Sequence, residues 1–150
     1  TPIGLSKGNP MQKEYTKDSW PTDRWRNFTY AEMRCKESFI CKMDDEFMDK
    51  LQTLRENVGF PLYITSAYRD ITHSIEAKKI EEGKSKGGTH TLGCAVDVKI
   101  QGAQAVVLLK EALEIGFTGF GISQTGKNRF IHLDSAESKE NAPRPHVWSY

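Results

Sequence analysis

Two pairs of histidine and aspartate residues are of the types that bind metal ions or carry out acid–base chemistry. His90 and Asp97 lie in the segment HTLGCAVD, and His132 and Asp134 lie in HLD. Asp97 stands between two valines, so its carboxylate needs a partner if that face is buried, and a cation would satisfy it. Imidazole and carboxylate groups are common ligands of zinc and similar divalent ions. These residues are therefore candidates for a functional site.

The elements that must position these residues are short strands. The segment CAVDVKI, which contains Asp97, has the apolar character of a buried strand. The segments FGIS and RFIHLD flank QTGKN, a glycine-containing connection typical of a β-hairpin. Because side chains alternate along a strand, Phe130, His132 and Asp134 are predicted to share one face.

A three-ligand site results if the strands that carry Asp97 and His132 are neighbours. His90, Asp97 and His132 would then leave the fourth tetrahedral position of Zn²⁺ to water, as in catalytic zinc sites. Nickel, cobalt or iron could use the same ligands, although zinc suits this mixed set best. The alternative for each residue alone is structural: a buried aspartate held by backbone N–H groups, or a hydrogen-bonded core histidine.

The remaining patterns predict an α+β fold. Apolar residues at helical spacing predict helices over residues 45–58 and 103–115, each followed by glycine, and residues 75–86 predict a short helix that runs into a loop. The run LYITS after Pro61 predicts another strand. We therefore expect a small antiparallel sheet with helices packed on one side, rather than a doubly wound sheet.

Length and charge limit the classes of protein that the chain could belong to. A chain of 150 residues is long enough for one domain, which we place at residues 28–150, after an irregular arm over residues 1–27. The net charge of +1 argues against a nucleic-acid-binding protein, and no apolar run is long enough to span a membrane. We expect a monomer.

The cysteine content leaves two structural alternatives. Cys35, Cys41 and Cys94 are an odd number, so one chain cannot pair all of them. Cys35 and Cys41 could form a bridge in an oxidising compartment. Free buried thiols are the favoured alternative.

Three motifs together resemble the M15-type zinc D-Ala-D-Ala metallopeptidases, which share their fold with the hedgehog signalling domain. The motifs are SxYR at residues 66–69, HxxGxAxD at residues 90–97 and HxD at residues 132–134. The closing RPHVWSY is similar to bacteriophage-encoded members, and the resemblance covers residues 25–150. The resemblance implies a hedgehog/DD-peptidase-like fold, and its closing segment implies a phage-encoded protein.

The resemblance also implies roles for individual residues. His90, Asp97 and His132 would bind Zn²⁺, and Arg69 would engage the substrate's carboxylate or polarised carbonyl. Ser66 and Tyr68 would contribute to substrate binding. From the residues alone, Arg69 pairing with a surface acid is an equally good interpretation.

One departure from the family pattern concerns the general base. Many carboxypeptidase members have an acidic residue three positions before the last zinc histidine, where this chain has Arg129. Asp134 is our candidate for accepting the proton of the zinc-bound water, and its alternative role is to orient a ligand. Farther along, Arg144 and Trp148 either fold back over the cleft or only anchor the C-terminal segment by packing.

The function implied is hydrolysis of peptidoglycan stem peptides next to D-amino acids, by a carboxypeptidase or an endopeptidase acting in the bacterial periplasm or cell wall. The alternative is a non-catalytic zinc-containing binding module or a virion structural component on the same fold, because a fold does not determine a function.

Overall fold

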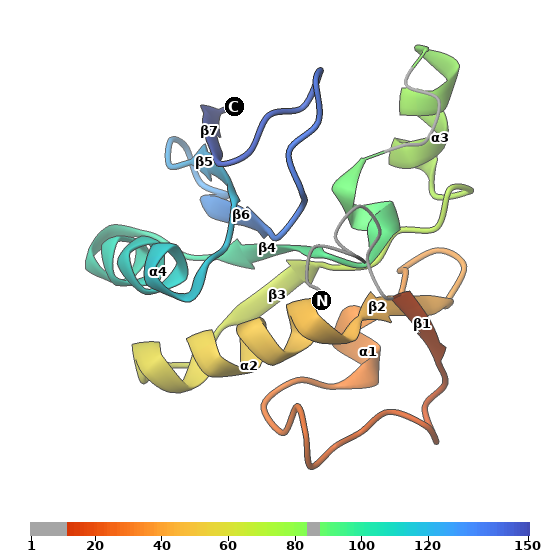
Figure 1. Ribbon diagram of the computed structural model, residues 1–150, viewed down its shortest axis with the longest axis horizontal. Coiled ribbons are helices and arrows are strands. Elements are labelled where there is room, and N and C mark those ends of the chain that lie inside the picture. Colours follow the sequence, from red (N-terminus) through yellow and green to blue (C-terminus); the bar gives the residue numbers. More distant parts are fainter. Residues whose placement is uncertain (1–11, 84–87) are drawn as a thin grey trace.

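The computed structural model describes residues 12–83 and 88–150, and its centre is a five-stranded mixed sheet (Figure 1). In spatial order the strands are β3 (Tyr63–Ser66), β4 (Ala95–Lys99), β6 (Phe130–Asp134), β5 (Gly119–Ser123) and β7 (His146–Ser149). All neighbouring strands are antiparallel except β5 and β7, which are parallel. The α+β class and the predicted hairpin of β5 and β6 are confirmed.

One row of residues crosses the whole sheet in register. Ser66 pairs with Asp97, Asp97 with His132, His132 with Gly121, and Gly121 with Trp148. Residues paired in this way place their side chains on the same face of a sheet. The predicted neighbours Asp97 and His132 therefore lie side by side.

The opposite face of the sheet forms the hydrophobic core. Val96, Val98, Ile131 and Leu133 alternate with the residues of that row and are fully buried. They pack in one cluster with apolar side chains of the two long helices, α2 (Asp45–Val58) and α4 (Gly102–Ile115), which also contact each other. The sheet therefore has one face for the core and one for the site.

The two long helices begin and end close to where their sequences predict. The carboxylate of Asp44 accepts a hydrogen bond from the backbone N–H of Phe47 at the start of α2. Gly59 and Gly116 follow α2 and α4 with φ of 76° and 108°, a conformation that favours glycine. The shorter helices are α1 (Tyr30–Met33), α3 (Ser74–Glu81) and the 3₁₀ helix η1 (Thr89–Leu92).

The described part of the predicted N-terminal arm is more ordered than expected. Strand β1 (Gln12–Tyr15) pairs with β2 (Cys41–Asp44) in a second, two-stranded sheet. Trp20 and Trp25 are buried and contact the ring of Tyr15 edge-on. The expectation of an irregular arm is thus wrong for residues 12–15, because backbone pairing with β2 and aromatic packing anchor them. Residues 1–11 lie outside the described part, and the boundary at residue 28 stays a prediction.

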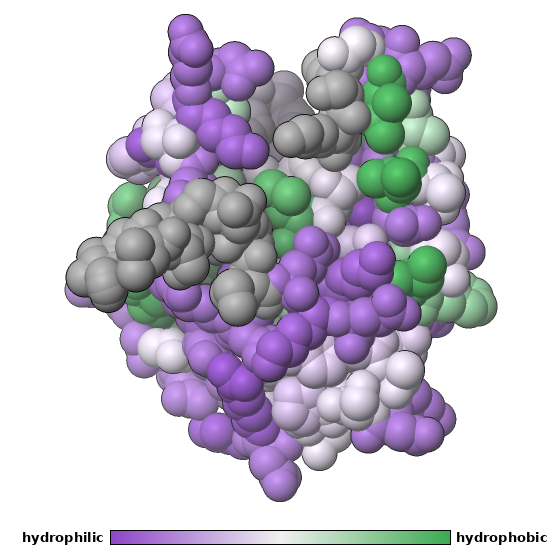
Figure 2. All heavy atoms as spheres, turned by 45° about the vertical axis from the view of Figure 1, so that its right-hand side comes forward, coloured by the Kyte–Doolittle hydropathy of each residue, from purple (hydrophilic) through white to green (hydrophobic). Residues whose placement is uncertain are grey.

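The three cysteines are all buried free thiols, as favoured from the sequence. Across residues 12–83 and 88–150, no helix has the length and apolar character needed to span a membrane. The surface seen in Figure 2 is largely hydrophilic, and its hydrophobic residues form small separate patches.

Candidate active site

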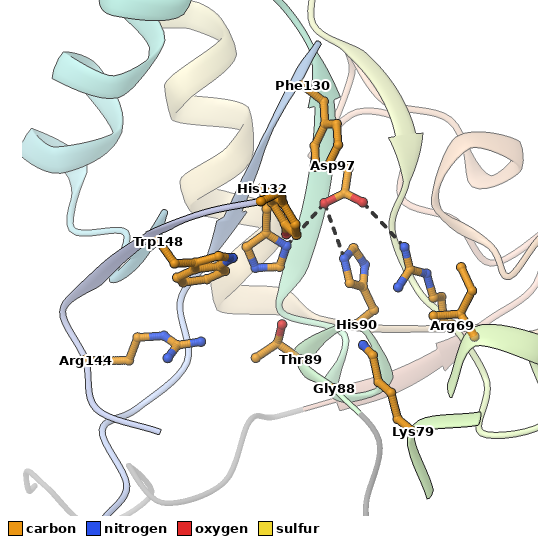
Figure 3. A pocket seen from close by; sticks show the side chains of 12 residues that line it. Arg69, Lys79, Gly88, Thr89, His90, Asp97, Phe130, His132, Arg144 and Trp148 are labelled. Carbon is orange, nitrogen blue, oxygen red and sulfur yellow. Dashed lines mark hydrogen bonds and ion pairs between the residues drawn. The ribbon is translucent and has the colours of Figure 1, made fainter. Parts of the chain in front are cut away.

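His90, Asp97 and His132 come together as the sequence predicts. One ligand atom from each residue lies within 4.8 Å of those of the other two. Asp97 Oδ1 lies 3.2 Å from His132 Nδ1 and 3.4 Å from His90 Nε2, and the three side chains point toward one another (Figure 3). All three side chains are largely withdrawn from solvent.

A sharp turn after η1 brings His90 back toward β4. Gly93 follows η1 with φ of 69°, and a Cβ atom at this position would lie 2.2 Å from the carbonyl oxygen of Lys42. No side chain fits there without moving the backbone of β2. The glycine of the HxxG motif is therefore required by this close approach.

A backbone hydrogen bond determines which nitrogen of His90 faces the cluster. His90 Nδ1 lies 2.6 Å from the carbonyl oxygen of Ala67, which can only accept a hydrogen bond. Nδ1 therefore carries the proton, and the lone pair of Nε2 points toward Asp97.

His132 turns its other ring nitrogen, Nδ1, toward Asp97. Its Nε2 lies 2.8 Å from Asp134 Oδ2, and two further hydrogen bonds join the Asp134 carboxylate to Arg144 at 3.0 and 2.9 Å. Because Asp134 is ionised, Nε2 of His132 carries the proton and Nδ1 faces Asp97. The two histidines thus present different ring nitrogens to the same carboxylate.

The electrostatics of the cluster favour a positive charge. Burial raises the pKa of Asp97, but the neighbouring imidazoles of His132 and His90 outweigh burial and keep it well below its usual value. Burial lowers the pKa of His132, but the adjacent carboxylates of Asp134 and Asp97 outweigh burial and raise it. For His90, burial dominates and the pKa is lowered. Two nitrogen lone pairs and one carboxylate thus share a space where a cation is favourable, and this donor set fits Zn²⁺.

Arg69 lies beside the cluster, where it was predicted. Its guanidinium donates hydrogen bonds to Glu76 Oε2 at 3.1 Å, Ser66 Oγ at 3.1 Å and Asp97 Oδ2 at 3.4 Å. These contacts fix the plane of the guanidinium beside the predicted metal ligands. Its acidic partner Glu76 is fully buried, so the surface ion pair considered from the sequence is not what the structure has.

Glu76 is a residue of the site that the sequence did not predict. Its carboxylate also accepts hydrogen bonds from the backbone N–H of Gly88 at 2.6 Å and from Lys79 at 3.3 Å. Although burial raises the pKa of Glu76, hydrogen bonds from Gly88 and Arg69 outweigh burial and lower it. Glu76 therefore links α3, the start of η1 and Arg69. The signal in the sequence was weak, since one glutamate in a lysine-rich helix looks solvent-exposed.

The three predicted ligands and Arg69 line a cavity of about 490 Å³, a volume in the range of small-ligand sites. The polar side of the cavity includes Arg69, Lys79 and His90. The aromatic side includes Phe130, Trp148 and Tyr150. The C-terminal segment thus folds back over the cleft, one of the two alternatives considered from the sequence.

Ser66, Tyr68 and Asp134 do not line this cavity. Ser66 contacts Arg69, and Tyr68 is buried with its hydroxyl 3.5 Å from the carboxylate of Asp70. Asp134 is fully buried. Ser66 and Asp134 contact residues that line the cavity, whereas the hydroxyl of Tyr68 does not.

Asp134 has a polar partner on both carboxylate oxygens. Besides His132 and Arg144, it accepts a hydrogen bond from the backbone N–H of Ala136 at 3.1 Å. Burial raises its pKa, but hydrogen bonds from His132 and Arg144 outweigh burial and lower it to about 2. A Cβ atom at Gly119 would lie 2.3 Å from both oxygens, so a glycine on β5 makes room for this carboxylate. These contacts favour the orienting role over proton transfer.

Arg129, at the position where many carboxypeptidases have an acid, does not line the cavity. Arg129 Nε donates a hydrogen bond to the carbonyl of Gly126 within the β5–β6 connection. Among the described residues that line the cavity, Asp97 is the only carboxylate.

Comparison with known proteins supports these observations. A family model described as Peptidase M15 matches residues 26–134. The chain is 28% identical over 102 residues to the peptidoglycan L,D-endopeptidase MepK of Escherichia coli (strain K12), and equally similar to MepK of Shigella flexneri. The match covers 67% of this chain and 55% of either relative, so the chain spans about half the length of these curated relatives. The chain belongs to the Peptidase M15 family.

Proposed function

We propose that the chain is a zinc-dependent peptidase that hydrolyses a peptide bond of peptidoglycan stem peptides next to a D-amino acid. The observation that carries this proposal is the convergence of His90, Asp97 and His132 at a cavity in a chain of the Peptidase M15 family. The name of the relatives, peptidoglycan L,D-endopeptidase, supports this substrate class and an action at the cell wall.

His90 Nε2, Asp97 and His132 Nδ1 are the atoms that would hold the metal. Bound Zn²⁺ lowers the pKa of a water ligand toward neutrality and polarises a carbonyl group. The protein's contribution is to fix the orientation of both imidazole rings. Ala67 does this for His90, and Asp134 holds the proton of His132 on Nε2.

Arg69 is proposed to bind the substrate. Its guanidinium lines the cavity next to Asp97 and is held in place by Glu76 and Ser66. A planar guanidinium can donate two parallel hydrogen bonds to a substrate carboxylate, or stabilise the negative charge that develops on a carbonyl oxygen. Ser66 serves this role indirectly, by positioning Arg69.

The test compares two substrate bonds in the presence and absence of zinc. The zinc-loaded protein is incubated with a D-Ala-D-Ala-terminated peptide and with a stem peptide that contains an L,D bond, and products are identified by mass spectrometry. We expect cleavage that stops after chelation and returns with zinc. Release of D-alanine indicates a carboxypeptidase, and cleavage at an internal bond of the stem peptide indicates an endopeptidase.

His90→Ala is the decisive variant, because it removes one predicted ligand. It should lose zinc and cleavage together. Lys110→Ala, which removes an exposed side chain of α4 that does not line the cavity, is the control and should retain both. Cleavage of purified peptidoglycan by His90→Ala at the rate of the unaltered protein would contradict the proposal.

A second candidate function is a non-catalytic zinc-containing module that binds stem peptides. One observation favours it: within the described lining of the cavity no carboxylate besides Asp97 is present to accept a proton. Zinc-dependent binding of both test peptides without any product would support this candidate over the peptidase.

A further inference from the structure

The C-terminal strand β7 forms a wall of the cavity that the family match does not include. The match ends at residue 134, whereas Arg144, Trp148 and Tyr150 all line the cavity. Figure 3 shows Trp148 next to His132, on the side away from Arg69. The family match therefore assigns no role to this wall, whose contacts are specific to this chain's C-terminal segment.

Trp148 is held firmly against the predicted metal ligands. The centre of its indole lies 5.2 Å from the ring centre of His132, and His146 stacks on it at 5.7 Å with an angle of 23° between the planes. The guanidinium carbon of Arg144 lies 5.3 Å from the indole centre. Arg144 also pairs with Asp134, which orients His132. The same arginine therefore contacts the wall and helps to position a predicted ligand.

Gly121 gives the two aromatic residues of this wall their position. A Cβ atom at Gly121 would lie 2.7 Å from Trp148 Nε1 and 2.9 Å from Tyr150 Oη, so only glycine leaves room for both. Trp148 Nε1 and Tyr150 Oη thus lie at the same point on β5, and the ring of Tyr150 lies 5.1 Å from that of Phe130. The three aromatic residues therefore form a continuous surface beside His132, here called the aromatic wall.

The aromatic wall is accessible from the cavity. Tyr150 is 67% exposed, although its neighbours hold it in place. The opposite side of the cavity presents the cationic groups of Arg69 and Lys79. A ligand that fits both sides has polar or anionic groups on one side and an apolar group on the other.

We propose that Trp148 and Tyr150 are specificity-determining residues that bind the aliphatic side chain of the substrate residue next to the scissile bond. This inference rests on the proposed peptidase function. Since Trp148 contacts the ring of His132, a group bound against it lies close to the reacting carbonyl. Aromatic faces gain dispersion energy against CH₂ groups.

The experiment uses glycan-free stem tetrapeptides with either alanine or norleucine next to the scissile bond. We expect the zinc-loaded protein to have a KM about tenfold lower for the norleucine peptide. Trp148→Ala and Tyr150→Ala should each lose most of this preference while binding zinc like the unaltered protein. Trp148→Phe should retain part of it.

Val147→Ala is the matched control, because Val147 lies on the same strand with its side chain on the opposite face and 63% exposed. It should leave the preference unchanged. Circular dichroism and zinc content are measured for every variant, so that a folding defect in Trp148→Ala is recognised, and Tyr150→Ala then carries the test.

Two outcomes would overturn the inference. One is an unchanged preference for norleucine in both folded alanine variants. The other is a change in KM that appears only with peptides that carry the disaccharide, since the wall would then bind sugar. If the unaltered protein cleaves nothing, the proposed peptidase function fails separately. The same preference is then measured as equilibrium binding of fluorescently labelled peptides, with the same variants and the same expectations.

Discussion

His90 and His132 reach the same carboxylate with different nitrogens, because each ring is fixed by a different partner. A backbone carbonyl orients His90, and the Asp134–Arg144 pair orients His132. Replacing the residue that orients a histidine should therefore weaken metal binding, although all three ligands remain. Asp134 is the residue at which the two roles considered from the sequence, orienting a ligand and accepting a proton, lead to different outcomes.

Asp134→Asn should weaken zinc binding by about 10- to 100-fold, because the neutral amide no longer fixes the proton of His132 on Nε2. Zinc affinity is measured by titration against a competing chelator, and kcat is measured at saturating zinc. Asp18→Asn, at an exposed aspartate, is the control. Unchanged zinc affinity with kcat lost would instead assign proton transfer to Asp134.

Asp134 should also make the metal-free protein sensitive to acid. Its pKa is about 2 in the folded protein, below the ordinary value of 3.8, so the folded state binds this proton more weakly than the unfolded state does. Its contribution, about 2 kcal/mol, is full above the unfolded pKa and is lost as pH falls through the folded pKa.

The measurement for this acid sensitivity is the free energy of unfolding in urea at a series of pH values between about 5 and 2. We expect a smaller decrease with falling pH for Asp134→Asn than for the unaltered protein or for Asp18→Asn. Equal decreases in all three proteins would show that another carboxylate is responsible.

Helix α3 and the 3₁₀ helix η1 depend on one carboxylate. Glu76 joins them through the N–H of Gly88 and also holds Arg69. The two helices are thus coupled by one buried charge. Without it, Arg69 and the N–H of Gly88 would lose their hydrogen-bond acceptor. Breaking such a buried pair costs about 3–5 kcal/mol.

Glu76→Gln should lower the free energy of unfolding by about 3 kcal/mol and raise the KM of the proposed substrate, because the guanidinium of Arg69 loses its charged partner. Urea unfolding and steady-state kinetics give the two values. Glu81→Gln, an exposed residue of the same helix, should change neither. The coupling is refuted if both variants are equally stable.

An element could be predicted from the sequence when neighbouring residues in the chain are enough to determine it. Helix α2 was predictable because its apolar residues recur at helical spacing between an aspartate cap and a glycine. Asp97 and His132 were predictable as neighbours because their strands are apolar and alternate. Strand β7 was not, since four residues without a buried apolar face gain their partner only from β5. The burial of Glu76 likewise depends on tertiary contacts that have no periodic signal.

The predicted metal ligands come together only in the folded molecule. His90 and Asp97 approach each other through a tight turn, whereas His132 joins them from a strand about a quarter of the chain away. A ligand that binds only the folded state stabilises it. Zinc binding and folding should therefore be linked across the whole chain.

Zinc at about 100 times its Kd should raise the melting temperature by about 5–10 °C. The measurement is a thermal melt with zinc and with a chelator. His90→Ala should show no zinc-dependent shift, and Lys110→Ala, at an exposed residue of α4, should show the full shift. A shift of the same size in His90→Ala would mean that zinc binds elsewhere.

The buried cysteines offer a way to observe local opening of the protein under native conditions. Burial raises the pKa of the Cys41 and Cys94 thiols to about 12, so near neutral pH almost none of either is the reactive thiolate. Alkylation therefore requires each thiol to become accessible first. Cys41 lies on β2 and Cys94 directly precedes β4. Their separate labelling rates would report whether the small sheet opens independently of the sheet that holds the site.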